Sequence, residues 1–167
     1  MSILHDDDTV NALERTPAGE ALSELILDLF VLNNRLLAAG DRLVAGLGLT
    51  SARWKLMGTM AAAERPQPVA WLARDMGGNR QNIQRIVNEL EREGLVQFQP
   101  NPHHRRAPLV AFTAAGQQAF EDAMHLQAPW INALSDGLPP AHIETTHRVV
   151  ALLCDRLAAA KENAPPQ

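Results

Sequence analysis

A short, sharply bounded helical segment, residues 79–94, constrains the fold of this sequence more than any other part of it. Asn79 stands at its start as a preferred N-cap residue, and Gly94 stands at its end, where a left-handed residue commonly closes a helix. Between them, apolar residues recur at three- and four-residue steps, as one buried helix face requires. These apolar residues are Ile83, Ile86, Val87 and Leu90.

The opposite face of this predicted helix carries amide and guanidinium side chains instead of the Glu and Lys that are typical of a solvated surface. Arg can bond both acceptors of guanine, and Asn or Gln can bond the donor and acceptor of adenine in the major groove of DNA. The acids of the segment are confined to its C-terminal half. An ordinary solvent-facing surface is the alternative, but the composition favours base recognition by Arg80, Gln81, Asn82, Gln84, Arg85 and Asn88.

Two further helices are predicted before this one. The first begins after the N-cap Thr50, with Leu49 and Trp54 spaced as a hydrophobic staple, and runs to about Glu64. The second is short, follows two prolines, and ends at a pair of glycines, which favour a tight turn. It is expected to bury Trp71, Leu72 and Met76.

Two short apolar stretches, residues 95–99 and 109–112, predict a β-hairpin directly after the polar helix. Its long connection, residues 100–108, carries a cationic cluster that is suited to a phosphate backbone or a narrow minor groove, unless it is simply an exposed loop. The cluster consists of His103, His104, Arg105 and Arg106. A helix-turn-helix followed by a basic hairpin predicts a winged helix-turn-helix: a mainly α fold with a small β-hairpin wing, which binds double-stranded DNA.

Long apolar helices are predicted on both sides of this unit. Residues 18–47 show helical periodicity without an internal proline, and a second apolar stripe follows near the C-terminus. Such helices need a partner surface, and a two-fold homodimer supplies one. The two recognition helices would then lie about 34 Å apart, which predicts a pseudo-palindromic operator. The C-terminal stripe consists of Ile143, Val150, Leu153, Cys154 and Leu157.

The predicted organisation has five parts. These are a mobile N-terminal segment (1–17), a dimerisation helix (18–47), the winged helix-turn-helix domain (49–113), C-terminal dimerisation helices (114–162) and a mobile tail (163–167). Charge follows this division. Residues 51–113 hold nine Lys or Arg and five Asp or Glu, a net charge of +4, although the whole chain of 167 residues has a net charge of -4. Only the middle is therefore expected to meet a polyanion.

Composition argues against several other classes of protein. The single cysteine, Cys154, excludes a disulfide within the chain and is expected to be a buried structural thiol. No apolar run is long enough for a membrane span, so the protein is predicted to be cytosolic. His142 and His147 miss the four-residue step of a helical metal site, and no phosphate loop or nucleophile motif is present. Neither an enzyme nor a metal or cofactor is predicted.

Several motifs resemble the multiple antibiotic resistance regulator (MarR) family of winged-helix transcription factors. They are Leu-Thr-Ser-Ala-Arg-Trp at 49–54, Leu-Ala-Arg-Asp-Met-Gly at 72–77, the segment 79–96, Arg-Arg at 105–106 and Phe-Thr-Ala-Ala-Gly at 112–116. The resemblance implies a recognition helix at 80–93, a wing at 100–107 and an intertwined dimer. In the wing, the family often has Asp-Pro-x-Asp-Arg-Arg, whereas this chain has Asn101-Pro102-His103-His104-Arg105-Arg106. An acid that would brace the wing arginines is missing.

The resemblance also implies a regulator, most often a repressor, that is released by a small aromatic or phenolic molecule. The effector pocket would be lined by Asn33, Asn34, Arg35, Arg53, Trp54 and Met57. Trp54 in the core and Arg53 paired with an acid are the alternatives for these two residues. The competing function is a winged-helix interaction module without specific DNA binding, which would carry acids or apolar residues on the face of the polar helix. The sequence has neither there.

Overall fold

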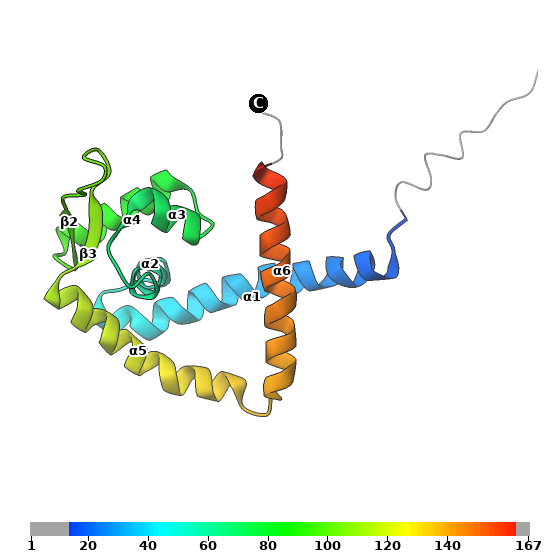
Figure 1. The fold of residues 1–167 in the computed structure, drawn as a ribbon. Coiled ribbons are helices and arrows are strands. Elements are labelled where there is room, and N and C mark those ends of the chain that lie inside the picture. The colour runs from blue at the N-terminus through cyan, green and yellow to red at the C-terminus, as the bar shows by residue number, and fades with distance from the viewer. Residues whose placement is uncertain (1–13, 163–167) are drawn as a thin grey trace, which may run out of the picture. The chain divides into compact units, whose positions relative to one another are not determined.

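The computed structural model describes residues 14–162, and the predicted tail and most of the predicted N-terminal segment lie outside them. The chain divides into two compact units, one ending at Leu126 and the other beginning at Gln127 within a long helix. In chain order the elements are α1 (Pro17–Val44), a 3-10 turn η2 (Ala45–Leu47), α2 (Ser51–Ala62), β1 (Gln67–Pro68), α3 (Val69–Asp75), α4 (Arg80–Arg92), β2 (Val96–Gln99), β3 (Leu109–Phe112), α5 (Ala114–Ser135) and α6 (Pro140–Glu162) (Figure 1).

Side-chain caps set where the main helices begin. The Thr50 hydroxyl accepts a hydrogen bond from the Arg53 amide at 3.3 Å, and the Asn79 side chain accepts one from the Gln81 amide at 2.8 Å. Each such cap contributes about 1 kcal/mol to stability. Gly94 has φ +73° directly after α4. The predicted bounds of the polar helix are therefore confirmed, and α2 ends two residues before the predicted Glu64.

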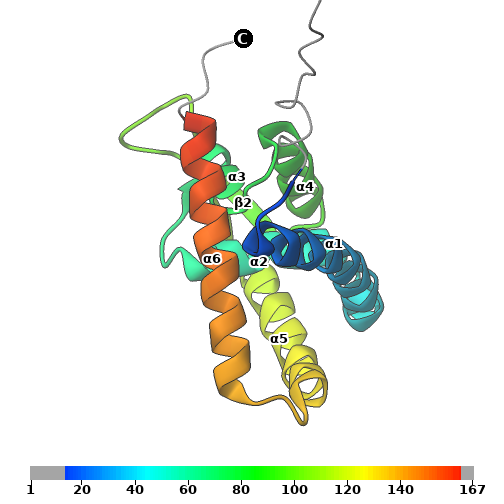
Figure 2. The same cartoon turned by 90° about the vertical axis from the view of Figure 1, so that its right-hand side faces the viewer.

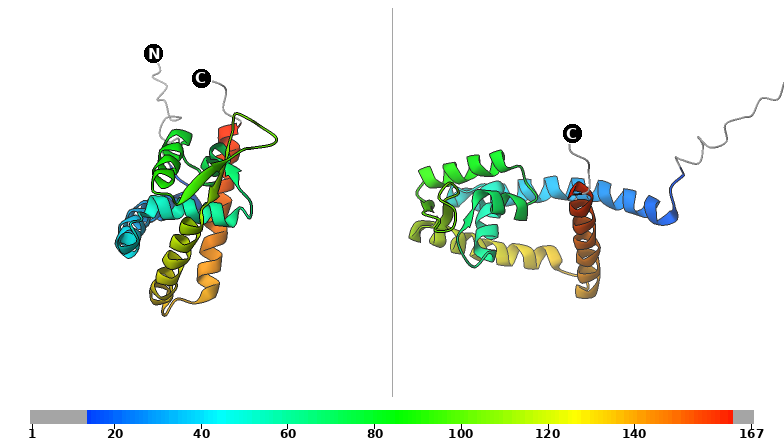
Figure 3. Two further views of the ribbon diagram at one scale, coloured as in Figure 1. Left: turned by 90° about the vertical axis from the view of Figure 1, so that its left-hand side faces the viewer. Right: turned by 45° about the horizontal axis from the view of Figure 1, so that its top comes forward.

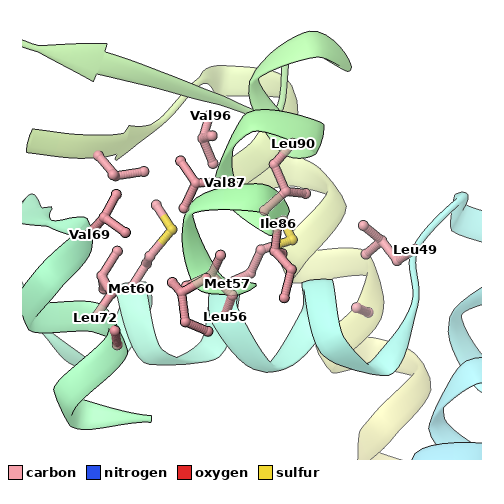
Figure 4. Close-up of a cluster of buried hydrophobic side chains, with 14 of the residues drawn as sticks. Leu49, Leu56, Met57, Met60, Val69, Leu72, Ile86, Val87, Leu90 and Val96 are labelled. Atoms are coloured by element: carbon pink, nitrogen blue, oxygen red, sulfur yellow. The ribbon is translucent and has the colours of Figure 1, made fainter. Parts of the chain in front are cut away.

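The apolar faces of α2, α3 and α4 meet in one core with the strands (Figure 4). The predicted stripe of α4 is at most 3% exposed at every position. Complete burial of side chains of this kind stabilises the fold by about 1.5–3 kcal/mol each. The largest fully buried side chains of the core are Leu56, Met57, Leu72, Leu90, Val44, Val87 and Val110.

The prediction that Trp71 is buried is wrong. Its residue surface is 44% exposed, whereas Leu72, its neighbour, is 1% exposed. Helix residues three and four apart share a face, so Val69, Leu72 and Ala73 form the buried side of α3 and Trp71 points away from it. The guanidinium carbon of Arg74 lies 5.7 Å from the centroid of a Trp71 ring.

The sheet has three strands, in the order β1-β3-β2, and all pairs are antiparallel. Sequence patterning predicted β2 and β3, whose register pairs Val96 with Phe112 and Gln99 with Leu109. It did not predict β1, because this strand has only two residues and one of them is Pro68. A proline has no amide hydrogen and fits only an edge strand, which is the position of β1.

Close contacts fix where α5 begins after β3. The Thr113 hydroxyl donates to the Gly94 carbonyl at 2.6 Å and accepts from the Gly116 amide at 3.0 Å. A Cβ atom at position 116 would overlap the main-chain carbonyl of Leu95, so only glycine fits there. The Thr-Ala-Ala-Gly motif therefore ties the start of α5 to the turn between α4 and β2.

A second junction attaches α1 to α2. The Ser51 amide donates to the Asp41 carboxylate at 2.6 Å, and its hydroxyl donates to the Leu37 carbonyl at 2.6 Å. Gly40 makes room for this approach, because an added Cβ would lie 2.5 Å from the Ser51 hydroxyl oxygen. The winged helix-turn-helix elements are thus connected firmly to the last turns of the long first helix.

The three long helices expose many large apolar side chains, and these are also the elements that the sequence predicts as a dimerisation domain. On α1, Leu27 and Phe30 are both 66% exposed. In the second unit, α6 exposes Leu157 at 72%, and Cys154 is exposed as well. The prediction of a buried thiol is therefore wrong for the single chain, although Val150 and Leu153 of the same stripe are half-buried. Among the described residues, no helix is long and apolar enough to cross a membrane.

Candidate nucleic-acid interface

Helix α4 and the loop between β2 and β3 lie at the same end of the first unit, and the loop extends beyond the sheet (Figures 2 and 3). Gln84 is half-buried, and the other five predicted base-contacting residues are exposed. All six side chains therefore lie outside the buried stripe of α4, and Arg80 and Gln84 lie next to the predicted wing.

Four of these six residues are already hydrogen-bonded within α4. The Gln84 amide donates to Asn88 at 2.8 Å, and Arg85 donates to Asn82 at 2.9 Å. Arg85 also forms an i,i+4 ion pair with Glu89, at 2.6 Å. Arg80 and Gln81 are exposed and make no side-chain hydrogen bond to any described residue. The helix thus presents two free polar side chains at its N-terminal end and two ordered pairs behind them.

The wing loop is braced by Asn101, a structural role that sequence patterning did not predict. Its side-chain amide donates to the Ala107 carbonyl at 2.9 Å and its oxygen accepts from the His103 amide at 3.0 Å. His104, which stands where the family often has an acid, contributes only main-chain bonds to the turn. Arg105 and Arg106 are exposed and pair with no carboxylate among residues 14–162. An Asn before a proline is a common turn-forming residue, which is the signal that could have identified Asn101.

A small cavity lies between the polar helix and the wing. Its volume is about 120 Å³, and it is lined by Arg80 and Gln84 of α4, by Arg106 of the wing and by the first residues of α3. The rest of its lining is apolar and consists of Pro68, Val69, Ala70, Phe98, Ala107 and Pro108. The structure therefore brings three of the predicted DNA-binding residues together from two separate elements.

Arg53 of α2 pairs with one acid of α4 and with the acid at its C-cap, which is one of the two alternatives that the sequence left open for it. Its guanidinium lies 3.5 Å from the Glu89 carboxylate and 2.8 Å from that of Glu93. Burial raises the pKa of Glu89, but the hydrogen bonds and charges of Arg85 and Arg53 outweigh it and hold this pKa below its ordinary value. The Glu89 carboxylate is therefore charged at neutral pH.

The six residues predicted to line an effector pocket differ in their surroundings. Met57 is completely buried in the core, Arg53 is occupied by its ion pairs, and Trp54 packs against the core from α2. The remaining three, Asn33, Asn34 and Arg35, are exposed on α1. A cavity of about 270 Å³ lies elsewhere, beside the sheet, with Met60, Leu72 and Phe112 among its apolar lining and Arg65 and Gln67 among its polar lining.

A helix-turn-helix followed by an antiparallel hairpin with a cationic loop defines the winged helix-turn-helix class of DNA-binding proteins. A family model described as the MarR family matches residues 47–107. The uncharacterised protein Mb2034c of Mycobacterium bovis is 31% identical over 143 residues, which cover 83% of this chain and 99% of that protein. The chain belongs to the MarR family, whose members are transcription regulators and not enzymes.

One named relative and two solved structures are also similar to this chain, the structures in fold. The transcriptional activatory protein BadR of Rhodopseudomonas palustris is 31% identical over 104 residues, covering 61% of this chain and 59% of BadR. The crystal structure of the MarR family regulator SP03579 superimposes with a TM-score of 0.72 at 21% identity, over 87% of this chain and 95% of that one. A mutant of E. coli MarR complexed with operator DNA gives 0.65 at 22% identity, over 77% and 94%. The predicted winged helix fold is confirmed.

Proposed function

We propose that this DNA-binding regulator is a homodimeric repressor that occupies a pseudo-palindromic operator and is released by a small aromatic or phenolic molecule. The observation that carries the proposal is the set of exposed amide and guanidinium side chains on α4 together with the exposed arginines of the wing, two elements that meet where Arg80 and Gln84 line one cavity with Arg106. It combines side chains that recognise base edges with arginines that have no carboxylate partner among the described residues.

In this proposal, the N-terminal part of α4 enters the major groove. Arg80, Gln81, Asn82, Gln84, Arg85 and Asn88 are the candidates for base contacts. The wing, with His103, His104, Arg105 and Arg106, contacts the backbone or the adjacent minor groove. The small cavity between Arg80 and Arg106 has the charge and size to receive one phosphate group.

The dimer is supported by the exposed apolar side chains of α1, α5 and α6. An isolated soluble chain rarely exposes so much apolar helix surface, and a two-fold partner would cover it. Segments 18–47 and 114–162 are therefore the proposed dimerisation elements, and residues 49–113 are the proposed DNA-binding domain. As a regulator of transcription, the protein is proposed to act in the cytoplasm.

Two further parts of the proposal concern regulation. The solved complex of E. coli MarR with operator DNA supports binding to an operator, whereas the name of BadR describes an activator. Measuring transcription of the target therefore decides between repression and activation.

For the effector, the cavity of about 270 Å³ beside the sheet approaches the size of usual ligand pockets, about 300 Å³ and more. Its apolar lining suits a small ring.

The experiment that tests this function is selection of bound duplexes from a random pool by the purified full chain, at low and at raised salt. The expected result is one enriched palindrome with half-sites about one helical turn apart. Binding that is sensitive to salt but enriches no sequence would reject the proposal and favour an interaction module. Transcription from the selected site, with and without the protein, then distinguishes repression from activation.

A further inference from the structure

The guanidinium group of Arg85 is held in place by two neighbours on its own helix. One terminal nitrogen donates to Glu89 Oε1 at 2.6 Å, and the other donates to Asn82 Oδ1 at 2.9 Å. Arg carries five N–H donors in a rigid planar fork, so these two bonds set the plane of the fork and leave other donors available. The side chain of Arg85 is nevertheless 63% exposed and accessible to a ligand.

Glu89 is itself fixed by a second arginine, from a different helix. Arg53 of α2 contacts Glu89 and Glu93, and it also donates to the main-chain carbonyl of Gly48 at 3.3 Å. The side chains of Arg53 and Glu89 are only 18% and 22% exposed, so water screens this pair less than it screens pairs at the open surface. Arg53 of α2 thus links the turn after α1 to Glu89, and Glu89 in turn contacts Arg85 on the polar face of α4.

We infer that Glu89 is a positioning residue for base recognition: anchored by Arg53, it orients the Arg85 guanidinium before DNA is bound and thereby sharpens base preference at one operator position. The inference rests on the proposed function of α4. An arginine that is already ordered loses less conformational freedom on binding, and a bidentate contact needs a defined fork plane. The Glu89 carboxylate also offsets one positive charge, which limits attraction to the phosphates of unrelated DNA.

The test uses the charge-neutral, nearly isosteric variant Glu89→Gln in the full chain. Its matched control is Glu93→Gln, which removes the same charge from the C-cap position directly after α4, where Glu93 contacts Arg53 but not Arg85. Competition binding is measured between the selected operator and all of its single-base variants. The position that Arg85 contacts is identified as the one whose preference disappears in Arg85→Ala.

At that position the unmodified protein should prefer its base by about fivefold or more, the usual effect of one good bidentate contact. Glu89→Gln should reduce this preference to about twofold or less there and nowhere else, while Glu93→Gln retains it. In the Arg85→Ala background, Glu89→Gln should cause no further change at this position, because no guanidinium remains to be oriented. A residue that only stabilised the fold would weaken binding to every sequence alike.

An unchanged base profile in Glu89→Gln, or equal losses in Glu89→Gln and Glu93→Gln, would overturn the inference. If Glu89→Gln does not fold, Glu89→Asp provides the same comparison, since it keeps the charge but withdraws the carboxylate by one carbon. If the unmodified protein selects no sequence at all, the proposed function fails together with this inference. If the unmodified protein selects an operator and Glu89→Gln shows the same base profile, only the role of Glu89 is rejected.

Discussion

At the scale of single residues, the ion pairs of Glu89 make the pKa of its carboxyl group depend on folding. Its pKa is held below the ordinary value of 4.5 by Arg85 and Arg53 against the opposing effect of burial. A carboxyl group whose pKa is lowered in the folded state stabilises that state above its unfolded pKa, and this contribution is lost as the pH falls through the folded pKa. The stabilisation from Glu89 is therefore complete at neutral pH and disappears in acid.

We expect Glu89→Gln to lower the free energy of unfolding at pH 7, and the difference from the unmodified protein to shrink as the pH is lowered below 4.5. Urea unfolding at a series of pH values measures this difference. Glu91→Gln is the control, because the Glu91 side chain forms no ion pair with a described residue. A difference for Glu89→Gln that stays constant with pH would contradict the proposed charge interaction.

Also at the residue scale, the wing arginines should determine part of the salt dependence of DNA binding. Removing both Arg105 and Arg106 by substitution with Ala is expected to reduce the slope of log K against log salt by about 0.9 for each phosphate that the wing no longer neutralises. The control is the double variant Arg15→Ala, Lys55→Ala, which removes the same charge from exposed positions outside the wing, the base-contacting residues and the proposed dimerisation helices. Similar slopes in both double variants would show that the wing does not bind phosphates.

At the scale of elements, the start of α5 depends on the absence of a side chain at Gly116. Gly116→Ala should lower the free energy of unfolding by about 2 kcal/mol or more, since the new methyl group meets a main-chain carbonyl that cannot move aside. Gly46→Ala is the matched control, because a Cβ there meets no atom within 4 Å, and it should leave stability nearly unchanged or slightly higher. Thermal or urea unfolding of both variants checks the prediction, which equal stabilities would refute.

At the scale of the whole molecule, the apolar surface of α1 should decide the oligomeric state. The double variant Leu27→Ser, Phe30→Ser changes two side chains that are each 66% exposed in the single chain. If they are buried in a dimer, their loss from both subunits weakens association by about 3 kcal/mol or more, a rise of at least about 100-fold in the dissociation constant. Sedimentation equilibrium measures this constant. Trp71→Ser, which changes an exposed apolar side chain of α3, is the control and should remain as dimeric as the unmodified protein.

The amino-acid sequence by itself determined the features that depend on neighbours along the chain. Helical periodicity, N-cap residues and a terminal glycine defined α4 and its buried stripe, and composition identified its polar face. These signals are local, because a cap bonds an amide two or three residues away and a stripe repeats every three or four residues. The wing and its cationic residues followed from the same kind of evidence.

Only the tertiary structure decided the features that need partners distant in sequence. The bond of Arg53 to Glu89 spans 36 residues, β1 exists because β3 lies beside it, and Gly116 is required by a carbonyl of another turn. The orientation of Trp71 likewise depends on which side of α3 faces the core. Periodicity cannot specify these contacts, since their free energy arises only after the chain has brought separate elements together.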